Sequence, residues 1–330
     1  MQLSAVLAAA FVLGGAPLSA GRSCKKSDVP PQSWARLMQM SKGNDYTSII
    51  PKECTALNLF GNNIGDSGAA ALAEVLKVNT ALTALDLHYN NIGAKGAAAI
   101  AEALKVNTAL ARLDLHYNDI GAGGANAIAG ALKVNAALET LLLHRNNIEV
   151  SGAGAIAEAL KVNAALTTVG LRNNAIGDLG ATAFAEALKT NTALTTLDVA
   201  YNKVGDAGAN ALAEALRINT ALTTLILSQN TIGDGAVAIA KSLIVNTALL
   251  TLDLRQNYME DSTIIDSIAT SLAENNDPAK RGEKAARDAS AVEAAQSALK
   301  HGGGRTPAAS YNGNVPGDVR PKGGHDSNEL

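Results

Sequence analysis

The sequence predicts an α/β solenoid in which eight strand-helix units of 28 residues form a right-handed horseshoe, with a parallel sheet on the concave face. The first observation is an asparagine that recurs every 28 residues, with a last step of 27. Its positions are Asn62, Asn90, Asn118, Asn146, Asn174, Asn202, Asn230 and Asn257. The second is alternation of apolar residues before this asparagine, and the third is helical spacing of apolar residues after it.

The strand half of each unit is short, as in "LDLHYNNIG" at 85–93. Leu85 and Leu87 are two residues apart, so both point to the same face of a strand. A single unit of this size cannot bury its own apolar face, which predicts a leucine core shared between neighbouring units. We expect the repeated asparagine to bond backbone groups where the chain leaves the strand.

The helix half is represented by "GAKGAAAIAEALKVN" at 93–107. Ala97, Ile100, Ala101 and Leu104 follow helical spacing, and Asn107 is expected to end the helix as a left-handed C-cap. Aspartates occur where an N-cap accepts bonds from free helix amides, namely at Asp66, Asp178, Asp206 and Asp234.

The unit L-x-x-L-x-L-x-x-N-x-I-G-x-x-G-A-x-A-I-A-E-A-L, which covers residues 55–276, closely resembles the ribonuclease-inhibitor-like class of leucine-rich repeats. This class also occurs in NOD-like receptors and in the Ran GTPase-activating protein. The resemblance implies a horseshoe fold and protein partners. Some units depart from the pattern: Glu149 replaces a glycine, one residue is lost near Gly235, and the last unit, "YMEDSTIIDSIATSL", contains no glycine. The last two units therefore resemble an approach to a terminal cap.

The first twenty residues, "MQLSAVLAAAFVLGGAPLSA", predict a signal peptide at 1–20. The apolar run is short, interrupted by glycine and proline, and followed by small residues, so we expect cleavage near Ala20 and no membrane insertion of the mature chain. This predicts a secreted protein or one of the secretory pathway. A frayed N-terminal extension, and with it a cytoplasmic location, is the alternative.

Residues 21–54, which include Trp34, are predicted to form an N-terminal cap. Cys54 lies 28 residues before the core position Leu82, so a buried free thiol is favoured over a Cys24–Cys54 bridge. Residues 277–330 predict a helix and then a disordered tail from Gly302. The helix has a weak apolar stripe at Ala285, Ala289, Val292 and Leu299.

Charge and motifs argue against nucleic-acid binding and against catalysis. The net charge is −3 and no cluster of Lys and Arg stands out, so nucleic acid is not an expected partner. "GDSG" at 65–68 is similar to a protease nucleophile segment, but it occupies the position of "GAKG" and "GAGG" in other units, at a helix start. "HGGG" at 301–304 lies in the predicted tail. We predict no catalytic residue and no cofactor.

Side chains between the core leucines are predicted to face the concave surface. The residues expected to bind there are Phe60, Asp86, His88, Tyr89, Arg112, Asp114, His116, Tyr117, His144, Arg145, Arg172 and Tyr201. Recent duplication of "LDLHYN" explains the clustering without any function, whereas tyrosine and arginine are the residues that usually dominate interface energy. A metal ion between His88, His116 and Asp86 is a sharper alternative. Because these homologous positions, which form columns across the strands, contain no closed ligand set, we predict no metal site.

The function predicted from the sequence is a non-catalytic protein-binding scaffold that uses the concave face. Its partner is an unidentified protein, and we expect a monomer. A GTPase-activating regulator similar to the Ran activator is one alternative, although the long acidic tail typical of that family is absent. An innate-immune recognition module is the other, although no nucleotide-binding domain precedes the repeats.

Overall fold

The computed structural model describes residues 22–28, 50–284 and 286. The chain divides into two compact units, Met1–Ala286 and Arg287–Leu330, and the second unit lies outside the described residues. Several predicted features also lie outside them: the signal peptide at 1–20, the middle of the N-terminal cap with Trp34, the stripe at Ala285, Ala289, Val292 and Leu299, and the tail from Gly302.

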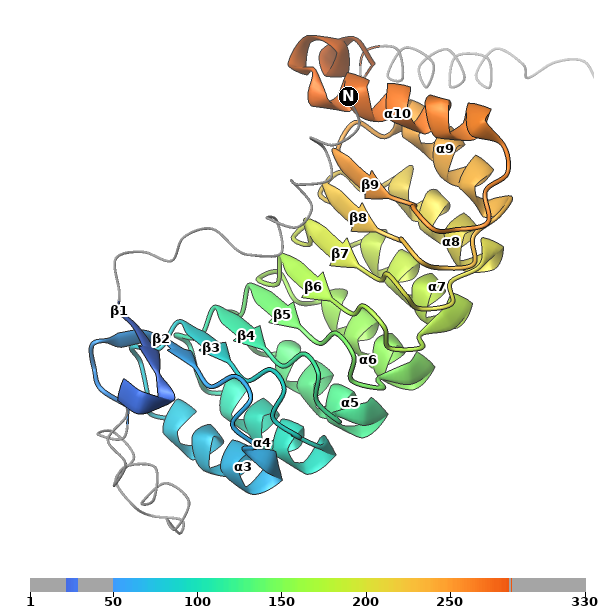
Figure 1. Cartoon of the computed structure of the whole chain (residues 1–330). Coiled ribbons are helices and arrows are strands. Elements are labelled where there is room, and N and C mark those ends of the chain that lie inside the picture. The colour runs from blue at the N-terminus through green and yellow to red at the C-terminus, as the bar shows by residue number, and fades with distance from the viewer. Residues whose placement is uncertain (1–21, 29–49, 285, 287–330) are drawn as a thin grey trace, which may run out of the picture. The chain divides into compact units, whose positions relative to one another are not determined.

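Strands and helices alternate along the described chain, which confirms the predicted α/β solenoid (Figure 1). The strands are β1 (Arg22–Lys25), β2 (Cys54–Asn58), β3 (Ala84–Asp86), β4 (Arg112–Asp114), β5 (Thr140–Leu142), β6 (Thr168–Gly170), β7 (Thr196–Asp198), β8 (Thr224–Ile226) and β9 (Thr251–Asp253). The helices are η1 (Lys26–Asp28), α3 (Gly65–Leu76), α4 (Ala94–Leu104), α5 (Gly121–Leu132), α6 (Glu149–Leu160), α7 (Gly177–Leu188), α8 (Asp206–Leu216), α9 (Gly235–Val245) and α10 (Ser262–Asn276).

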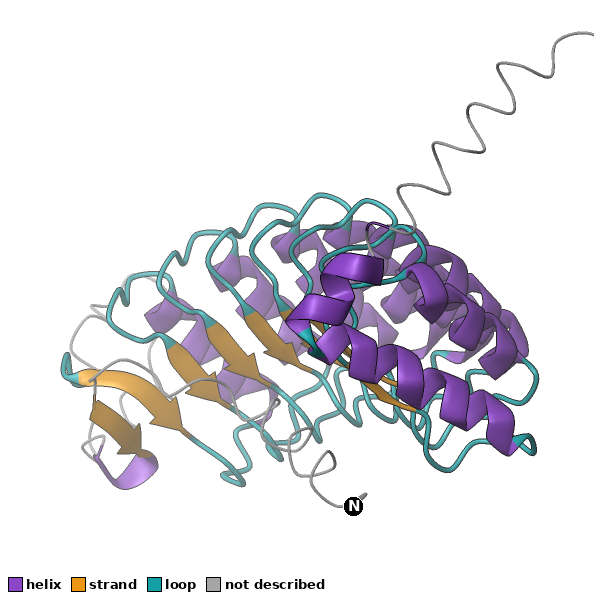
Figure 2. Cartoon of the chain, turned by 90° about the horizontal axis from the view of Figure 1, so that it is seen from above, coloured by secondary structure: helices purple, strands orange, loops and turns teal. Residues whose placement is uncertain are grey.

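The nine strands form one parallel sheet whose order follows the sequence. Each strand pairs with its homologue in the next unit, so that Leu85 lies beside Leu113 and Leu113 beside Leu141. The strands line the inner side of the array of repeats and the helices lie on the outer side (Figure 2). This layering places the residues that flank each strand on one continuous surface.

The core lies between the sheet and the helices and is shared by neighbouring units. Leu85, Leu87 and Ile100 are fully buried, and so is Leu115 in the following unit. Adjacent helices approach closely at glycines such as Gly124, where an added Cβ would lie 2.9 Å from Ala97 Cβ. The alternating leucines predicted to point inward are therefore confirmed as the core of the solenoid.

The repeated asparagine joins each unit to its neighbour through backbone groups. Asn118 is 6% exposed, and its Oδ1 accepts bonds from the backbone N–H groups of Asn90 (3.0 Å) and Ile92 (2.9 Å). Its Nδ2 donates to the carbonyl oxygens of Leu87 (3.0 Å) and Leu115 (2.9 Å). One side chain thus satisfies buried backbone groups of two units, as the sequence predicted.

A second asparagine ladder runs along the turn between helix and strand. Asn107 Nδ2 donates to the carbonyl oxygens of Leu76 (2.7 Å) and Asn79 (3.0 Å), and Asn107 Oδ1 accepts from the N–H of Leu110 (2.8 Å). Asn135, Asn163, Asn191, Asn219 and Asn246 repeat this arrangement. The predicted left-handed C-cap was wrong. Helix α4 ends at Leu104, its C-cap residue Lys105 is right-handed, and Asn107 is not among the left-handed residues of the described chain.

The predicted aspartate caps belong to the neighbouring helix and not to their own. Asp66 Oδ1 accepts from the backbone N–H groups of Gly93 and Gly96, both at 2.8 Å, at the start of α4. Asp178 bonds the start of α8 and Asp206 the start of α9 in the same way, whereas Asp234, the N-cap residue of α9, makes no side-chain cap bond. The prediction of bonds to helix amides was correct for three positions, but the helix assigned to each was wrong.

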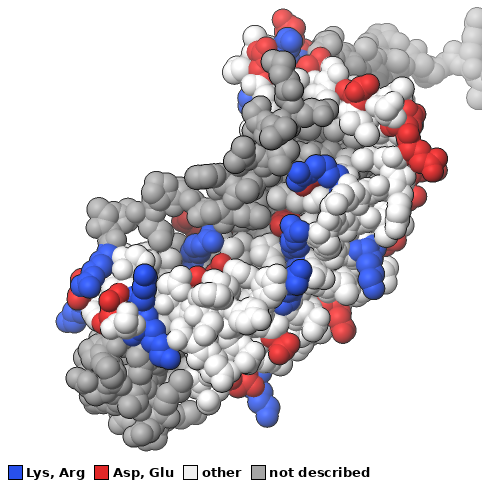
Figure 3. Space-filling view, in the orientation of Figure 1, with Lys and Arg blue, Asp and Glu red and all other residues white. Residues whose placement is uncertain are grey.

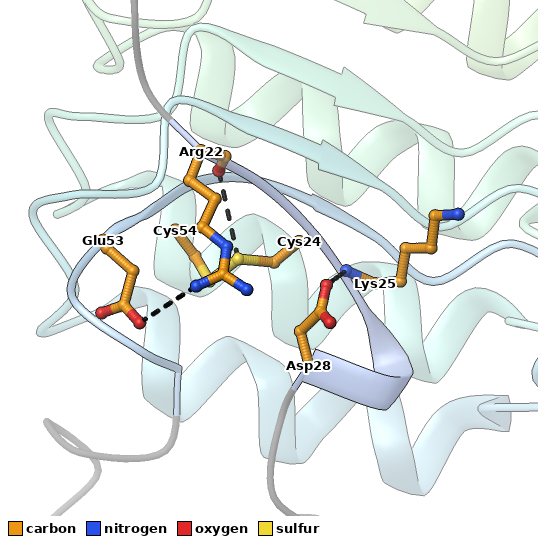
Figure 4. The surroundings of a disulfide bond; sticks show 6 residues. All are labelled: Arg22, Cys24, Lys25, Asp28, Glu53 and Cys54. Atoms are coloured by element: carbon orange, nitrogen blue, oxygen red, sulfur yellow. Dashed lines mark hydrogen bonds and ion pairs between the residues drawn. A yellow bond between two sulfur atoms is a disulfide. The ribbon is translucent and has the colours of Figure 1, made fainter.

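Cys24 and Cys54 form a disulfide, so the prediction of a free thiol at Cys54 was wrong (Figure 4). Strand β1 pairs in parallel with β2, which brings the two Cα atoms to 5.7 Å. Both cysteine side chains are buried, as the 28-residue spacing from Leu82 predicted for Cys54. The exposed pair Arg22–Glu53 lies beside the bridge. The repeat pattern predicted that Cys54 is buried, but it contained no information on β1, the strand that carries Cys24.

At the other end, α10 covers β9 only in part. An apolar pocket of about 850 Å³ lies between them and is lined by Leu252, Leu254, Met259, Ile268 and Leu272 among others. A helical segment follows at 278–284, where the sequence predicts a helix, and most of the predicted helix lies outside the described residues. Among the described helices, none combines the length and the apolar character needed to cross a membrane.

Replacing Asn118 with alanine is expected to lower the free energy of unfolding by about 2 to 4 kcal/mol, because several buried backbone groups lose their partners. Chemical denaturation measures this change. Lys95→Ala, an exposed helix substitution, is the matched control and should remain within about 0.5 kcal/mol of the parent protein. A loss for Asn118→Ala no larger than for the control would mean that water replaces the ladder.

The double substitution Cys24→Ser with Cys54→Ser is expected to cost about 3 kcal/mol at the N-terminal end, because the bridge closes a loop with a sequence separation of 30 residues. Denaturant unfolding of the oxidised and reduced parent proteins checks the result independently. An unfolding midpoint that does not move on reduction would contradict a stabilising role.

Candidate functional site

The residue three positions after the end of each strand from β2 to β9 has a left-handed backbone conformation. Strict alternation would send His88 and Tyr89 to opposite faces of a strand. Strand β3, however, ends at Asp86, and Tyr89 has a φ of 60°. The homologous residues Gly61, Tyr117, Arg145, Asn173, Tyr201, Gln229 and Gln256 also have positive φ. His88, Tyr89 and their homologues in other repeats can therefore face the same surface. Glycine readily adopts positive φ, so Gly61 was the residue in the sequence that indicated this conformation.

A row of four rings in contact crosses the first four repeats. The Phe60 ring stacks on His88 with centroids 4.0 Å apart, and His88 stacks on His116 at 4.2 Å with planes 9° apart. His144 meets His116 edge to face at 6.2 Å. The 28-residue register brings these homologous side chains side by side. We call these four residues the ring row.

Carboxylates fix the orientation of two imidazoles in the ring row. Asp86 Oδ1 lies 2.5 Å from His88 Nδ1, and Asp114 Oδ1 makes the corresponding contact with His116 Nδ1. Each carboxylate also accepts the backbone N–H of its histidine. Arg112 Nη2 lies 3.8 Å from Asp114 Oδ2. Each imidazole is thus held by its Nδ1 atom, which leaves Nε2 as the remaining ring nitrogen.

Exposed tyrosines lie alongside the ring row. Tyr89 is 60% exposed and Tyr117 is 41% exposed, with ring centroids 5.8 Å apart. The Arg145 guanidinium lies 4.7 Å from the Tyr117 ring centroid, and Phe60 contacts Tyr89 edge to face. These four residues, which we call the aromatic patch, form a continuous surface of exposed aromatic and cationic groups.

The other predicted binding residues are not part of this patch. Arg172 and Tyr201 form a separate cation–π pair, with 4.3 Å between the guanidinium carbon and the ring centroid. Asp114 is on the concave side but only 7% exposed, and Arg112 is half-buried beside it. The predicted residues therefore form one large group, to which the Arg172–Tyr201 pair is joined by a backbone hydrogen bond from Arg172 to His144. Asp114 belongs to this group but is buried.

His144 occupies a space that exists because the next repeat has a glycine. A Cβ added to Gly170 would lie 2.4 Å from His144 Cε1. The backbone N–H of Arg172 donates to His144 Nδ1 at 3.0 Å, so this nitrogen carries no proton. Burial lowers the pKa of His144 from 6.5 to about 4, which keeps the imidazole neutral.

Buried acidic groups on the concave side have different pKa values. Burial raises the pKa of Asp198 to about 6, although the backbone N–H of Ala200 donates to it at 2.9 Å. Burial also opposes ionisation of Asp114, but the hydrogen bond and charge of His116 bring its pKa below the ordinary value. The sequence did not single out Asp198, because its position matches the more exposed Asp86 in another repeat.

The opposite pKa shifts of His144 and Asp198 predict opposite effects on stability. The folded state holds His144 unprotonated between pH 6.5 and about 4, so this group makes stability rise with pH in that window. The folded state holds a proton on Asp198 between pH 3.8 and about 6, so this group makes stability fall with rising pH.

Asp198→Asn should therefore make the free energy of unfolding increase more steeply from pH 4 to 6, and His144→Gln should shift the slope the other way. Each change is expected to be on the order of 1 kcal/mol per pH unit, measured by urea unfolding across the window. Equal slopes in both variants would contradict the assignment.

A comparison with protein-family models agrees with this architecture. The family model described as Leucine Rich repeat matches residues 55–73, 78–101, 106–129, 162–185, 190–213 and 219–240. No curated protein matches the chain. Among solved structures, the chain is similar to leiomodin-1 actin-binding site 2, at 26% identity and a TM-score of 0.43 over 49% of this chain and 95% of that chain. It is also similar to the tropomodulin C-terminal domain from Caenorhabditis elegans, at 14% identity and a TM-score of 0.42 over 46% of this chain and 93% of that chain. The matched segments and the 28-residue strand-helix units show that the chain is a leucine-rich repeat protein.

Proposed function

We propose that this protein is a non-catalytic protein-binding module of the ribonuclease-inhibitor-like class, and that the aromatic patch on its concave face contacts the partner. The observation that carries the proposal is the continuous exposure of Phe60, Tyr89 and Tyr117 beside Arg145. The α-helices of 11 or 12 residues within 28-residue units support the assignment to this class.

The patch has the chemistry of an interface centre. Tyrosine and arginine are enriched among residues whose truncation costs binding energy. The Tyr117 ring is already held by Arg145 on one side and Tyr89 on the other, so little side-chain freedom is lost on binding. The surrounding concave surface offers room for a standard interface of about 800 Å² on each partner.

Charge supports a protein partner over a nucleic acid. Lys and Arg side chains are interspersed with Asp and Glu over the face seen in Figure 3. On the helices, several lysines are paired with glutamate one turn away, such as Lys105 with Glu102 and Lys161 with Glu158. Nucleic-acid binding requires an excess of unpaired cations along the contact surface.

We also propose that the protein follows the secretory pathway and acts as a monomer. The Cys24–Cys54 disulfide supports secretion, because disulfides persist in oxidising compartments. The sequence at 1–20 has the order of a signal peptide, with an apolar run followed by small residues. The terminal strand β1 presents Arg22 and Lys25, and charged edges oppose pairing with another sheet.

The double substitution Tyr89→Ala with Tyr117→Ala is expected to weaken partner capture about tenfold or more, because the centre of the proposed interface is removed. Tagged protein is used for capture from both secreted and cytosolic fractions, and bound proteins are quantified by mass spectrometry. Thermal unfolding should remain nearly unchanged, since both side chains are exposed.

Tyr258→Ala is the matched control, because this tyrosine is 71% exposed and lies outside the aromatic patch. It should capture the same proteins as the parent. Equal capture by the patch variant and the Tyr258 variant would reject the proposed surface.

A further inference from the structure

We propose that His88, Asp114 and His116 form a binding site for a divalent transition-metal ion such as Zn²⁺ or Cu²⁺. Each residue offers one ligand atom, and these atoms lie within 4.8 Å of one another. From the sequence, Asp86 was the expected third neighbour of the two histidines, and no closed ligand set was predicted. The structure places Asp114, from the neighbouring strand, in that third position.

The Asp–His contacts fix the orientation of both imidazoles. A ligating imidazole usually donates its other ring N–H to a carboxylate, which fixes the tautomer and the ring orientation. Asp86 is placed to do this for His88. Asp114 has a different role: it is the third ligand of the proposed site, and its contact with His116 Nδ1 keeps that ring beside it. Both carboxylates are fixed in turn by backbone N–H groups. The histidines are thus oriented before any ion arrives.

The position of the cluster suits an ion that arrives from solvent. The side chains of His88 and His116 are 22% and 25% exposed, so an ion can reach them from the concave side. Donor atoms around tetrahedral zinc are ~3.3 Å apart, since each Zn–N distance is about 2.0 Å. The stacked rings, with centroids at 4.2 Å, must therefore tilt toward each other when they bind.

The donor set and the local charge select the class of ion. Two imidazoles and one carboxylate favour Zn²⁺, Cu²⁺ or Ni²⁺ over Mg²⁺ or Ca²⁺, which prefer sets composed of oxygen atoms. Asp86 and Asp114 together provide two negative charges. Arg112, at 3.8 Å from Asp114, offsets one of them. Three protein ligands leave at least one coordination position for water or for a group from another molecule.

His144 is close to the cluster but is not a ligand, which makes it a matched control. Its Nδ1 accepts the backbone N–H of Arg172, so its Nε2 carries the proton in the neutral ring. Its ring is edge to face with His116 at 6.2 Å and does not extend the parallel stack.

The test is calorimetric titration of the full chain with ZnCl₂, in a background where His301 and His325 are replaced by glutamine. We expect one saturable equivalent of Zn²⁺ per chain. His88→Gln and His116→Gln should each weaken binding at least tenfold, whereas His144→Gln should bind as the background protein does. The absence of saturable binding, or equal affinity in the His88 variant and the background protein, would overturn the proposal.

Electron paramagnetic resonance of the same background protein with one equivalent of Cu²⁺ provides a measurement that needs no ligand variant. Two imidazole nitrogens bound to copper are expected, and a spectrum with fewer than two would overturn the site. This result decides the question even if His116→Gln fails to fold. Because the aromatic patch is not required for metal binding, the outcome is independent of the capture experiment.

Discussion

The structure depends on the satisfaction of buried backbone groups by side chains of the neighbouring repeat. Strands of three residues make few ladder bonds, and the turns on both sides of each strand carry N–H and C=O groups that lie in the core. Asn118 on one side of the strand and Asn107 on the other bond these groups across the repeat boundary. Because an unpaired buried amide is costly, each repeat is stable only with a neighbour in register.

This constraint explains which parts of the fold the sequence could predict. Period and alternation define where a residue lies within its own unit, so the buried leucines and the first asparagine ladder were predicted correctly. They do not define which unit supplies a bonding partner. Asp66 was therefore assigned to its own helix, although it bonds the start of α4, and Asn107 was taken for a C-cap. The Cys24–Cys54 bridge was missed for a related reason, since strand β1 precedes the first repeat and has no counterpart in the pattern.

The candidate site was predictable to a similar extent. The homologous positions of successive repeats predicted that Phe60, Tyr89 and Tyr117 share one surface, and the structure groups them there. The repeat pattern could not show how deeply each of these side chains is buried. Homologous positions are exposed in one repeat and buried in the next, because the neighbouring side chains differ. Gly170, for example, lets His144 lie over its backbone, and this close contact depends on two adjacent repeats at once.

Duplication and function are therefore not competing explanations of the histidine and tyrosine columns. When two adjacent repeats are copies, the register places identical side chains side by side, and imidazoles or phenols stack without any further selection. The same register brings His88 of one repeat and the Asp114–His116 pair of the next within 4.8 Å of one another. The pattern ends where the copies diverge, since Arg172, Ala200 and Ser228 succeed the histidines. A repeat array can thus acquire a binding surface at the moment of duplication, and later substitutions determine how far along the solenoid that surface extends.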